Sequence, residues 1–342
     1  MIAEIALLAS MAGPEMVGGY PLEHGVLPWL ARVGTRDLAC SGALVAPGWV
    51  LTAAHCAEIA RDPEAFVLLN AESLDDPRAS RHAIVDVAVI PTYADENRWH
   101  DLALAHISPP ATVRPIDLSL APQPGRVAAT MIAGWGWETY PDGDRTTPRW
   151  AAVDALLPAD ECGPAGRYDD SQNVCVRGAQ GQGPCHGDSG GPLWDNTGLL
   201  GVASRGPSGC DSDRPSIYIS VGEPEHRRWV EDTIAGDLVA RLEAPQGAVS
   251  GIGLLRGWVA SSDGHDPYRL LEVEIDGRYA FSLPCCGDRG DVAEEILGAS
   301  LWSGFAGLYN WELERPGTHD LAVRIGDSAG DQLVLRQTVE VQ

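Results

Sequence analysis

The stretch Cys185-His186-Gly187-Asp188-Ser189-Gly190-Gly191-Pro192 places one serine inside a tight turn rich in glycine. Glycine adopts backbone conformations that other residues avoid, so such a turn can present a serine hydroxyl together with neighbouring backbone N–H groups. A serine hydroxyl is a poor nucleophile at neutral pH and needs a base to remove its proton. The stretch therefore predicts a nucleophilic Ser189 that works with a base from another part of the chain.

Two further motifs precede this turn, Thr52-Ala53-Ala54-His55-Cys56 and Asp101-Leu102-Ala103-Leu104. In residue type and chain order, the three motifs resemble the trypsin/chymotrypsin family of serine endopeptidases. The resemblance implies that His55 is the general base, that Asp101 orients its ring, and that Ser189 is the nucleophile. Inactive relatives of such enzymes generally lack one of these three residues, and this chain keeps all of them.

The same resemblance assigns the groups that stabilise the negative charge developing on the substrate carbonyl. The backbone N–H groups of Gly187 and Ser189 match the oxyanion hole of the family. Ser204, in the run Ala203-Ser204-Arg205-Gly206, matches the serine that supports the buried aspartate and is also assigned to the substrate pocket.

Specificity is expected to follow from the pocket that receives the side chain before the cut. Gly183 stands where trypsin-like members carry the aspartate that binds arginine or lysine, and Gly206 and Ser216 match the pocket walls. We therefore expect a preference for uncharged apolar or aromatic side chains, not for arginine or lysine. A glutamate-specific protease is the alternative, because His186 and Arg205 flank the pocket.

The stretch Met16-Val17-Gly18-Gly19 resembles the new N-terminus that activation cleavage creates in this family. The resemblance implies a zymogen in which the freed ammonium of Met16 pairs with Asp188. Residues 1–15 are interpreted as a signal remnant or propeptide. Glu15 precedes the cut, where the family usually has arginine or lysine, so activation by a trypsin-like enzyme is not expected. Three alternatives stay open: an acidic-specific protease, stepwise trimming or an unusual signal cleavage.

Eight cysteines favour disulfide bonds and an oxidising compartment, which predicts a secreted or periplasmic protein. Six of them match the pairing of the family, which implies the bridges Cys40–Cys56, Cys162–Cys175 and Cys185–Cys210. Cys285 and Cys286 are adjacent and leave three alternatives open: a vicinal disulfide, two thiols or an intermolecular link.

The 342-residue chain carries a formal net charge of -24, and its 24 basic residues are all arginines. Nucleic acids and anionic membranes bind clustered positive charge, so neither is an expected partner. No run reaches the roughly 18 to 20 apolar residues of a membrane helix. The expected partners are a protein or peptide substrate, an activating protease, and an unknown protein or surface for the C-terminal part of the chain.

Residues 16–242 are interpreted as one trypsin-like serine protease domain. Short apolar runs such as Trp29–Val33 and Ile84–Ile90, separated by Gly, Pro and Asp, are typical of an antiparallel barrel. The apolar spacing over Glu223–Leu242 predicts one amphipathic helix. The expected fold class is all-β, a chymotrypsin-like double antiparallel β-barrel that ends in this helix.

A linker is expected over residues 243–248 and a second domain over 249–342. A further all-β pattern is carried by the runs Gly257–Val259, Leu270–Gly277, His319–Ile325 and Leu333–Leu335. Turns at these spacings suit a small β-sandwich, and the segments resemble Ig-like domains appended to secreted bacterial proteins.

An acidic segment containing Asn70, Glu72, Asp75 and Asp76 falls near the loop that binds calcium in some relatives. Carboxylate oxygens suit that ion, but a solvated acidic turn is the favoured interpretation. No pair of histidines has the spacing of zinc ligands. Catalysis is therefore expected to need no metal and no cofactor.

The sequence predicts a secreted serine endopeptidase that hydrolyses peptide bonds through an acyl-enzyme on Ser189. The alternative from another class is a non-catalytic protease homologue that acts in adhesion or recognition. The two differ in whether a serine-directed inhibitor labels Ser189.

Overall fold

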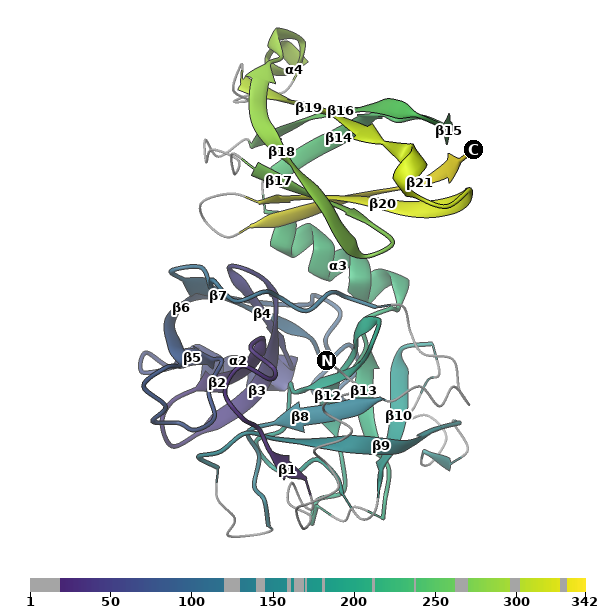
Figure 1. Cartoon of the computed structure of the whole chain (residues 1–342). Coiled ribbons are helices and arrows are strands. Elements are labelled where there is room, and N and C mark those ends of the chain that lie inside the picture. Colours follow the sequence, from purple (N-terminus) through teal and green to yellow (C-terminus); the bar gives the residue numbers. More distant parts are fainter. Residues whose placement is uncertain are drawn as a thin grey trace. The chain divides into compact units, whose positions relative to one another are not determined.

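The computed structural model (Figure 1) describes residues 19–119, 130–139, 145–158, 161–162, 169, 171–179, 182–210, 213–236, 238–261, 270–295, 302–326 and 331–342. Contacts divide the chain into two compact units, Met1–Val230 and Glu231–Gln342. Met16, to which the sequence assigned the activated N-terminus, lies outside the described residues. No helix in the described part of the chain is long and apolar enough to cross a membrane.

The first unit begins with a closed antiparallel barrel whose strands follow the order β2-β3-β4-β7-β6-β5. The strands are β2 (Leu30–Gly34), β3 (Ala39–Ala46), β4 (Trp49–Thr52), β5 (Phe66–Leu69), β6 (Ser80–Val89) and β7 (Ala103–Ser108). Its interior is filled by small and branched side chains, among them Val33, Leu44, Val50, Val67 and Ile107. Closure satisfies the backbone groups of both edges, which an open sheet would leave unpaired.

A second antiparallel barrel closes because β9 pairs with both β8 and β10. Its strands are β8 (Met131–Gly134), β9 (Arg149–Leu157), β10 (Asn173–Gly178), β11 (Pro192–Asp195), β12 (Gly198–Arg205) and β13 (Ser216–Ser220). The short β1 (Tyr20–Pro21) adds to β9 from outside. A separate core that includes Ile132, Val176, Leu193, Leu200 and Tyr218 fills this barrel.

The helix predicted over Glu223–Leu242 is wrong in its second half. The helix α3 spans Pro224–Ala235, and β14 begins at Leu238 and continues to Ala244. Gly236 has φ +52°, a left-handed conformation that commonly ends a helix. Leu238 and Leu242 suit a helix through their spacing of four, but the same spacing also places them on one face of a strand.

The second unit is one sheet of eight strands in the order β14-β16-β19-β18-β17-β20-β21-β15. The remaining elements of this unit are β15 (Ala248–Val249), β16 (Ile252–Ser261), β17 (Leu270–Ile275), β18 (Arg278–Asp288), α4 (Gly290–Glu295), β19 (Trp302–Asn310), the 3-10 helix η4 (Trp311–Leu313), β20 (Gly317–Gly326) and β21 (Gln332–Val341). β18 pairs with β17 and with β19, and both pairings contain register shifts. One core takes residues from strands all along this sheet, such as Leu255, Val273, Val323 and Val339.

The second unit therefore has the all-β character that the sequence predicted, whereas its kinship with Ig-like domains stays a prediction. Because β14 pairs with β16, residues before the predicted linker 243–248 already belong to the sheet of this unit. Cys285 and Cys286 both lie in β18 and are bonded to each other as a vicinal disulfide.

Candidate active site

The three motifs meet in the first unit. His55 lies in a short 3-10 helix, η1 (Ala54–Cys56), after β4, and Asp101 lies two residues before the first residue of β7. Ser189 lies in the turn before β11, in the second barrel. His55 and Ser189 line the same pocket, a cavity of about 1290 Å³ with walls from both barrels.

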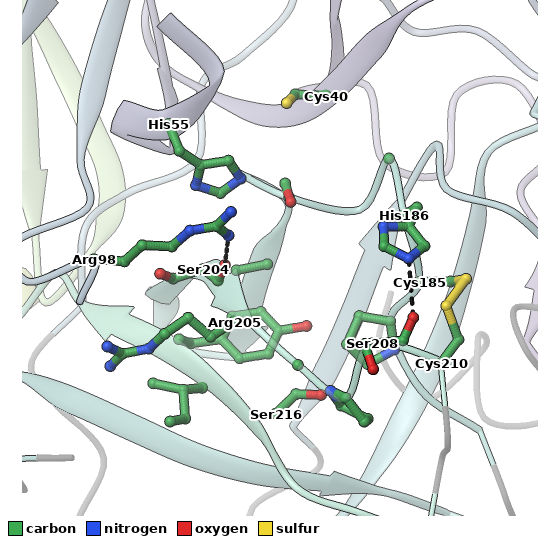
Figure 2. Close-up of a pocket in the computed structure, with 18 of the residues that line it drawn as sticks. Cys40, His55, Arg98, Cys185, His186, Ser204, Arg205, Ser208, Cys210 and Ser216 are labelled. Carbon is green, nitrogen blue, oxygen red and sulfur yellow. Dashed lines mark hydrogen bonds between the residues drawn. A yellow bond between two sulfur atoms is a disulfide. The ribbon is translucent and has the colours of Figure 1, made fainter. Parts of the chain in front are cut away.

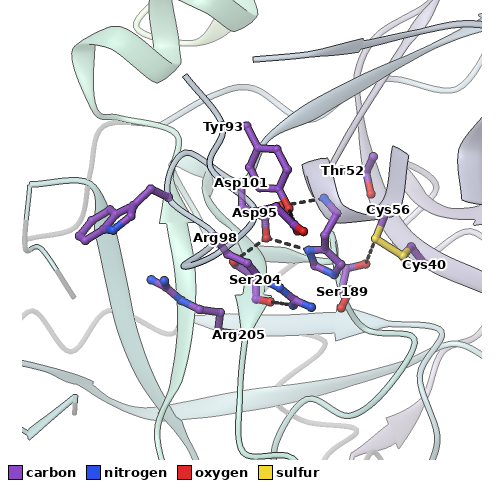
Figure 3. Close-up of polar contacts among 12 residues, drawn as sticks. Cys40, Thr52, Cys56, Tyr93, Asp95, Arg98, Asp101, Ser189, Ser204 and Arg205 are labelled. Carbon is purple, nitrogen blue, oxygen red and sulfur yellow. Dashed lines mark hydrogen bonds and ion pairs between the residues drawn. A yellow bond between two sulfur atoms is a disulfide. The ribbon is translucent and has the colours of Figure 1, made fainter. Parts of the chain in front are cut away.

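Asp101 holds His55 through two hydrogen bonds (Figure 3). The carboxylate is fully buried and accepts from the His55 backbone N–H at 2.9 Å and from His55 Nδ1 at 2.7 Å. Ser204 Oγ donates to the same carboxylate at 2.6 Å. A carboxylate accepts only, so His55 carries its proton on Nδ1 and keeps the lone pair of Nε2 for another partner.

The turn that carries Ser189 is clamped between the barrels. The Ser41 backbone N–H donates to Ser189 O at 2.8 Å, and the Gly190 N–H donates to Ala203 O at 2.8 Å. Gly190 has φ +81°, and a Cβ there would lie 2.1 Å from Thr52 Oγ1. Only glycine fits this position without displacing its neighbours.

Two backbone N–H groups of the turn remain available. Asp188 and Gly191 donate their N–H groups to backbone carbonyls within the turn. Within the described ranges, no group accepts a hydrogen bond from the N–H of Gly187 or of Ser189. Gly187 has φ +103°, which favours glycine. Two unpaired donors in one turn, at the serine and two residues before it, are groups that can bind an anionic oxygen.

Ser41, to which the sequence assigned no role, supports this turn. Its side chain is fully buried in β3, where Oγ donates to Gly187 O at 2.9 Å and accepts from the Trp135 N–H at 2.8 Å. A small polar residue in an apolar strand carries no signal of its own, because its two partners lie far away in sequence.

Asp188 is the second buried carboxylate of the site. It accepts from the backbone N–H groups of Gly136 and Cys185, each at 2.8 Å. A Cβ on Gly134 or Gly136 would lie less than 2.5 Å from a carboxylate oxygen of Asp188. Burial raises the pKa of Asp188 to about 6, although the two hydrogen bonds act in the opposite direction.

Three disulfides join the pairs that the family resemblance implied: Cys40–Cys56, Cys162–Cys175 and Cys185–Cys210. The first connects β3 to the residue after His55, and the last connects the Ser189 turn to the segment after β12. Each closes a loop of the unfolded chain, which typically stabilises a fold by about 2 to 4 kcal/mol.

The pocket (Figure 2) contains Ser204, Gly206 and Ser216 in its lining, whereas Gly183 is buried and does not line it. A Cβ on Gly206 would approach Ser216 Oγ to 3.1 Å, so glycine keeps this wall open. Arg98, for which the sequence predicts no role, also lines the pocket.

In the acidic segment considered for calcium, arginine side chains of the same chain form ion pairs with the carboxylates. Arg78 pairs with Asp76 at 2.9 Å and with Glu72 at 2.6 Å, and Arg36 pairs with Asp75 at 2.9 Å. Arg78 is the main reason that the pKa of Asp76 lies well below its ordinary value.

Comparison with known proteins matches this chain to one family. The sequence model of the Trypsin family matches residues 16–230. Kallikrein-2 of Homo sapiens is 30% identical over 264 residues, covering 69% of this chain and 98% of the relative. Trypsin of Squalus acanthias is 31% identical over 229 residues, covering 65% of this chain and 96% of the relative.

A solved structure of similar fold is neuropsin, a serine protease expressed in the limbic system of mouse brain. It aligns with a TM-score of 0.56 and 27% identity over 63% of this chain and 98% of its own. The double barrel is therefore the chymotrypsin-like fold. Because the family model covers more than half of the chain, this protein belongs to the trypsin family of serine proteases and is a serine endopeptidase.

Proposed function

We propose that this endopeptidase cuts peptide bonds with Ser189 as nucleophile, His55 as general base and Asp101 as the residue that orients His55. The observation that carries the proposal is the fully buried Asp101, which engages His55 Nδ1 at 2.7 Å while His55 and Ser189 line one pocket. This arrangement directs the free nitrogen of the base away from Asp101.

In the proposed reaction, Ser189 Oγ attacks the scissile carbonyl as its proton passes to His55 Nε2. The unpaired N–H groups of Gly187 and Ser189 stabilise the oxyanion, and each such donor typically contributes a factor of about 10² to 10³ in rate. The imidazolium, stabilised by Asp101, then protonates the leaving amine. Water attacks the acyl-enzyme with the same base, which releases the acid and restores Ser189.

The substrate pocket is proposed to take an uncharged apolar or aromatic side chain before the cut. Its lining includes the small residues Gly206 and Ser216, the Cys185–Cys210 disulfide and the ring of Tyr218. Glutamate specificity is the second candidate, because His186 and Arg205 also line the pocket. Cleavage of a mixed peptide library distinguishes the two, and dominant cutting after arginine would contradict both.

Activation is proposed to follow a cut after Glu15, which frees the ammonium of Met16 to pair with Asp188. Support comes from the burial of Asp188, because a buried carboxylate without a cation is costly. The three disulfides of the first unit support secretion or a periplasmic location. N-terminal sequencing of active protein tests the cut, and a first residue other than Met16 would refute it.

Covalent labelling tests the catalytic proposal. An irreversible serine-directed inhibitor should label the processed protein stoichiometrically, and Ser189→Ala should abolish labelling and hydrolysis. Ser250→Ala, at an exposed serine of the second unit, is the matched control and should label normally. Processed protein that takes no label would instead support a non-catalytic homologue that acts in adhesion or recognition.

A further inference from the structure

Four arginines, Arg98, Arg145, Arg205 and Arg214, line the catalytic pocket of a strongly acidic chain. Aspartate and glutamate outnumber arginine by 48 to 24, yet Arg98 and Arg205 both line the cavity that contains His55 and Ser189. Many other arginines of the described residues pair with carboxylates, for example Arg36 with Asp75, Arg78 with Asp76 and Arg289 with Glu243.

Arg98 directs its guanidinium into the pocket, between the ring of His55 and Ser204 (Figure 2). Its Nη1 donates to Ser204 O at 2.9 Å. Over the described part of the chain, Arg98 makes no ion pair, although a guanidinium carries five N–H donors. The backbone of Arg98 is left-handed, with φ 52°, a conformation that is uncommon for residues other than glycine and occurs often at functional sites.

Arg205 lies at the end of β12 and keeps Arg98 in place by a reciprocal contact. Its Nη1 donates to Asn97 O, its Nη2 donates to Asn173 Oδ1 at 2.7 Å, and its Cζ lies 5.8 Å from the Trp99 ring centroid. Arg98, in the loop that contains Asn97, thus binds the Ser204 carbonyl of β12. Arg205 of β12 in turn binds the Asn97 carbonyl of that loop. This exchange orders the loop beside the pocket and brings two positive charges to one side of it.

The acidic groups of the lining do not neutralise Arg98. Asp95, Glu96 and Glu161 line the cavity too, and all three are exposed. The Tyr93 hydroxyl donates to Asp95 at 2.7 Å. Arg98 therefore remains a positive group near the reacting serine with donors left over for a ligand.

We propose that Arg98, next to Arg205, binds a carboxylate side chain of the peptide substrate, in the second residue before the cut. The inference rests on the proposed function of the triad. In the proposed binding mode, a peptide with its scissile carbonyl at Ser189 and its preceding side chain beside Gly206 passes along Ser204, so that the side chain one residue earlier reaches Arg98 on the His55 side of the pocket. The planar fork of a guanidinium matches a carboxylate through two parallel hydrogen bonds.

The proposal differs from glutamate specificity in the pocket itself, because it concerns the neighbouring residue. Peptides for the test share one residue before the cut, chosen by library profiling or set to phenylalanine if the library is not cleaved, and differ only in the second residue: Asp, Glu, Asn, Gln or Arg. We expect kcat/KM for the acidic peptides to exceed that for their amide isosteres by about tenfold. The preference should weaken between 0.1 and 1 M salt, as the Debye length falls from about 10 to about 3 Å.

Variants assign the effect to Arg98. Arg98→Gln should lose the acidic preference, measured within that variant as the ratio of kcat/KM for acidic peptides to kcat/KM for their amide isosteres, and Arg98→Glu should favour the arginine peptide. Arg278→Gln is the matched control, because Arg278 is exposed, pairs with Glu314 and does not line the pocket. It should retain the full preference.

Binding of the same labelled peptides to Ser189→Ala separates this inference from the catalytic proposal. If Ser189→Ala binds acidic peptides about tenfold more tightly than amide peptides, the carboxylate site is supported. If the wild type in addition cleaves none of the peptides, the proposed triad is refuted while the site stands. Cleavage with equal rates on acidic and amide peptides would refute the site and leave the triad intact. An unchanged preference in Arg98→Gln, or an acidic preference confined to the residue directly before the cut, would also overturn it.

Discussion

The hydroxyl of Ser41 donates to the carbonyl of Gly187 at 2.9 Å, which joins a buried strand of the first barrel to the serine turn of the second. The same hydroxyl accepts from the Trp135 N–H. The Ser41 hydroxyl is fully buried and holds the carbonyl of Gly187 in place. This carbonyl belongs to the same residue as the unpaired Gly187 N–H. We interpret Ser41 as a positioning residue for the proposed oxyanion site.

Ser41→Ala should lower kcat by about tenfold or more with little change in KM, because small displacements of catalytic groups cost rate before they cost binding. It should also lower the free energy of unfolding by about 1 to 3 kcal/mol, since two buried backbone groups lose their partner. Steady-state kinetics and urea unfolding measure the two effects. Ser303→Ala is the control, because Ser303 is buried but its hydroxyl has no hydrogen-bond partner within the described ranges. A loss of stability with unchanged kcat would make Ser41 merely structural.

Asp101→Asn should reduce kcat by a factor on the order of 10⁴ while the protein stays folded. An amide directs a donor at His55 Nδ1, where the carboxylate only accepts, so the proton moves to Nε2 and the base is lost. Presteady-state acylation with an ester substrate measures the step directly. The same isosteric change at Asp62, which is exposed and caps the Glu64 N–H, should leave kcat unaltered. Near wild-type acylation in Asp101→Asn would contradict the assigned role.

Asp188 predicts a pH-dependent stability of the uncut chain. Burial raises its pKa to about 6, above the value near 4 of an unfolded chain, so its stability contribution is fully present below pH 4 and is lost as pH rises through 6. The shift corresponds to about 3 kcal/mol. Between pH 4 and 7, unfolding free energies of the uncut wild type should therefore fall more than those of Asp188→Asn.

Cleavage after Glu15 should reduce this difference, because the ammonium of Met16 would then compensate the charge of Asp188. Chemical denaturation of the cut and uncut forms at both pH values makes the comparison. Equal pH dependence in the cut and uncut wild type would contradict the pairing.

Leu238 and Val239 distinguish a strand from a continued helix. Leu238 is 4% exposed in the core of the second unit, whereas its neighbour Val239 is 43% exposed. Leu238→Ala should destabilise the second unit by about 2 to 5 kcal/mol, and Val239→Ala by no more than about 0.5 kcal/mol. A helix that buried its apolar face would make both substitutions costly. Equilibrium unfolding of the full chain, followed by a probe in each unit, provides the measurement.

Much of the candidate site could be predicted because its residues lie in short motifs. Each proposed triad residue, His55, Asp101 or Ser189, lies in a short motif whose neighbouring residue types suit the local backbone conformation. The glycines around Ser189, for example, permit its tight turn. The cysteine pairs were equally accessible through the family pattern. The end of α3 was not, because Leu238 and Leu242 satisfy both a helical and a strand spacing, and only pairing with β16 decides between them.

Residues whose role depends on a distant partner escaped the sequence. Ser41 lies 146 positions from Gly187, and Arg98 lies 106 positions from Ser204, so no window of sequence contains either pair. Residue type and local order were enough to predict the family, which the family match confirms, and to propose the nucleophile and its base, because these depend on short-range backbone and chemical requirements. The support of the serine turn and the positive side of the pocket required the packing of two barrels, since burial and hydrogen bonding between distant segments arise only when the chain is folded.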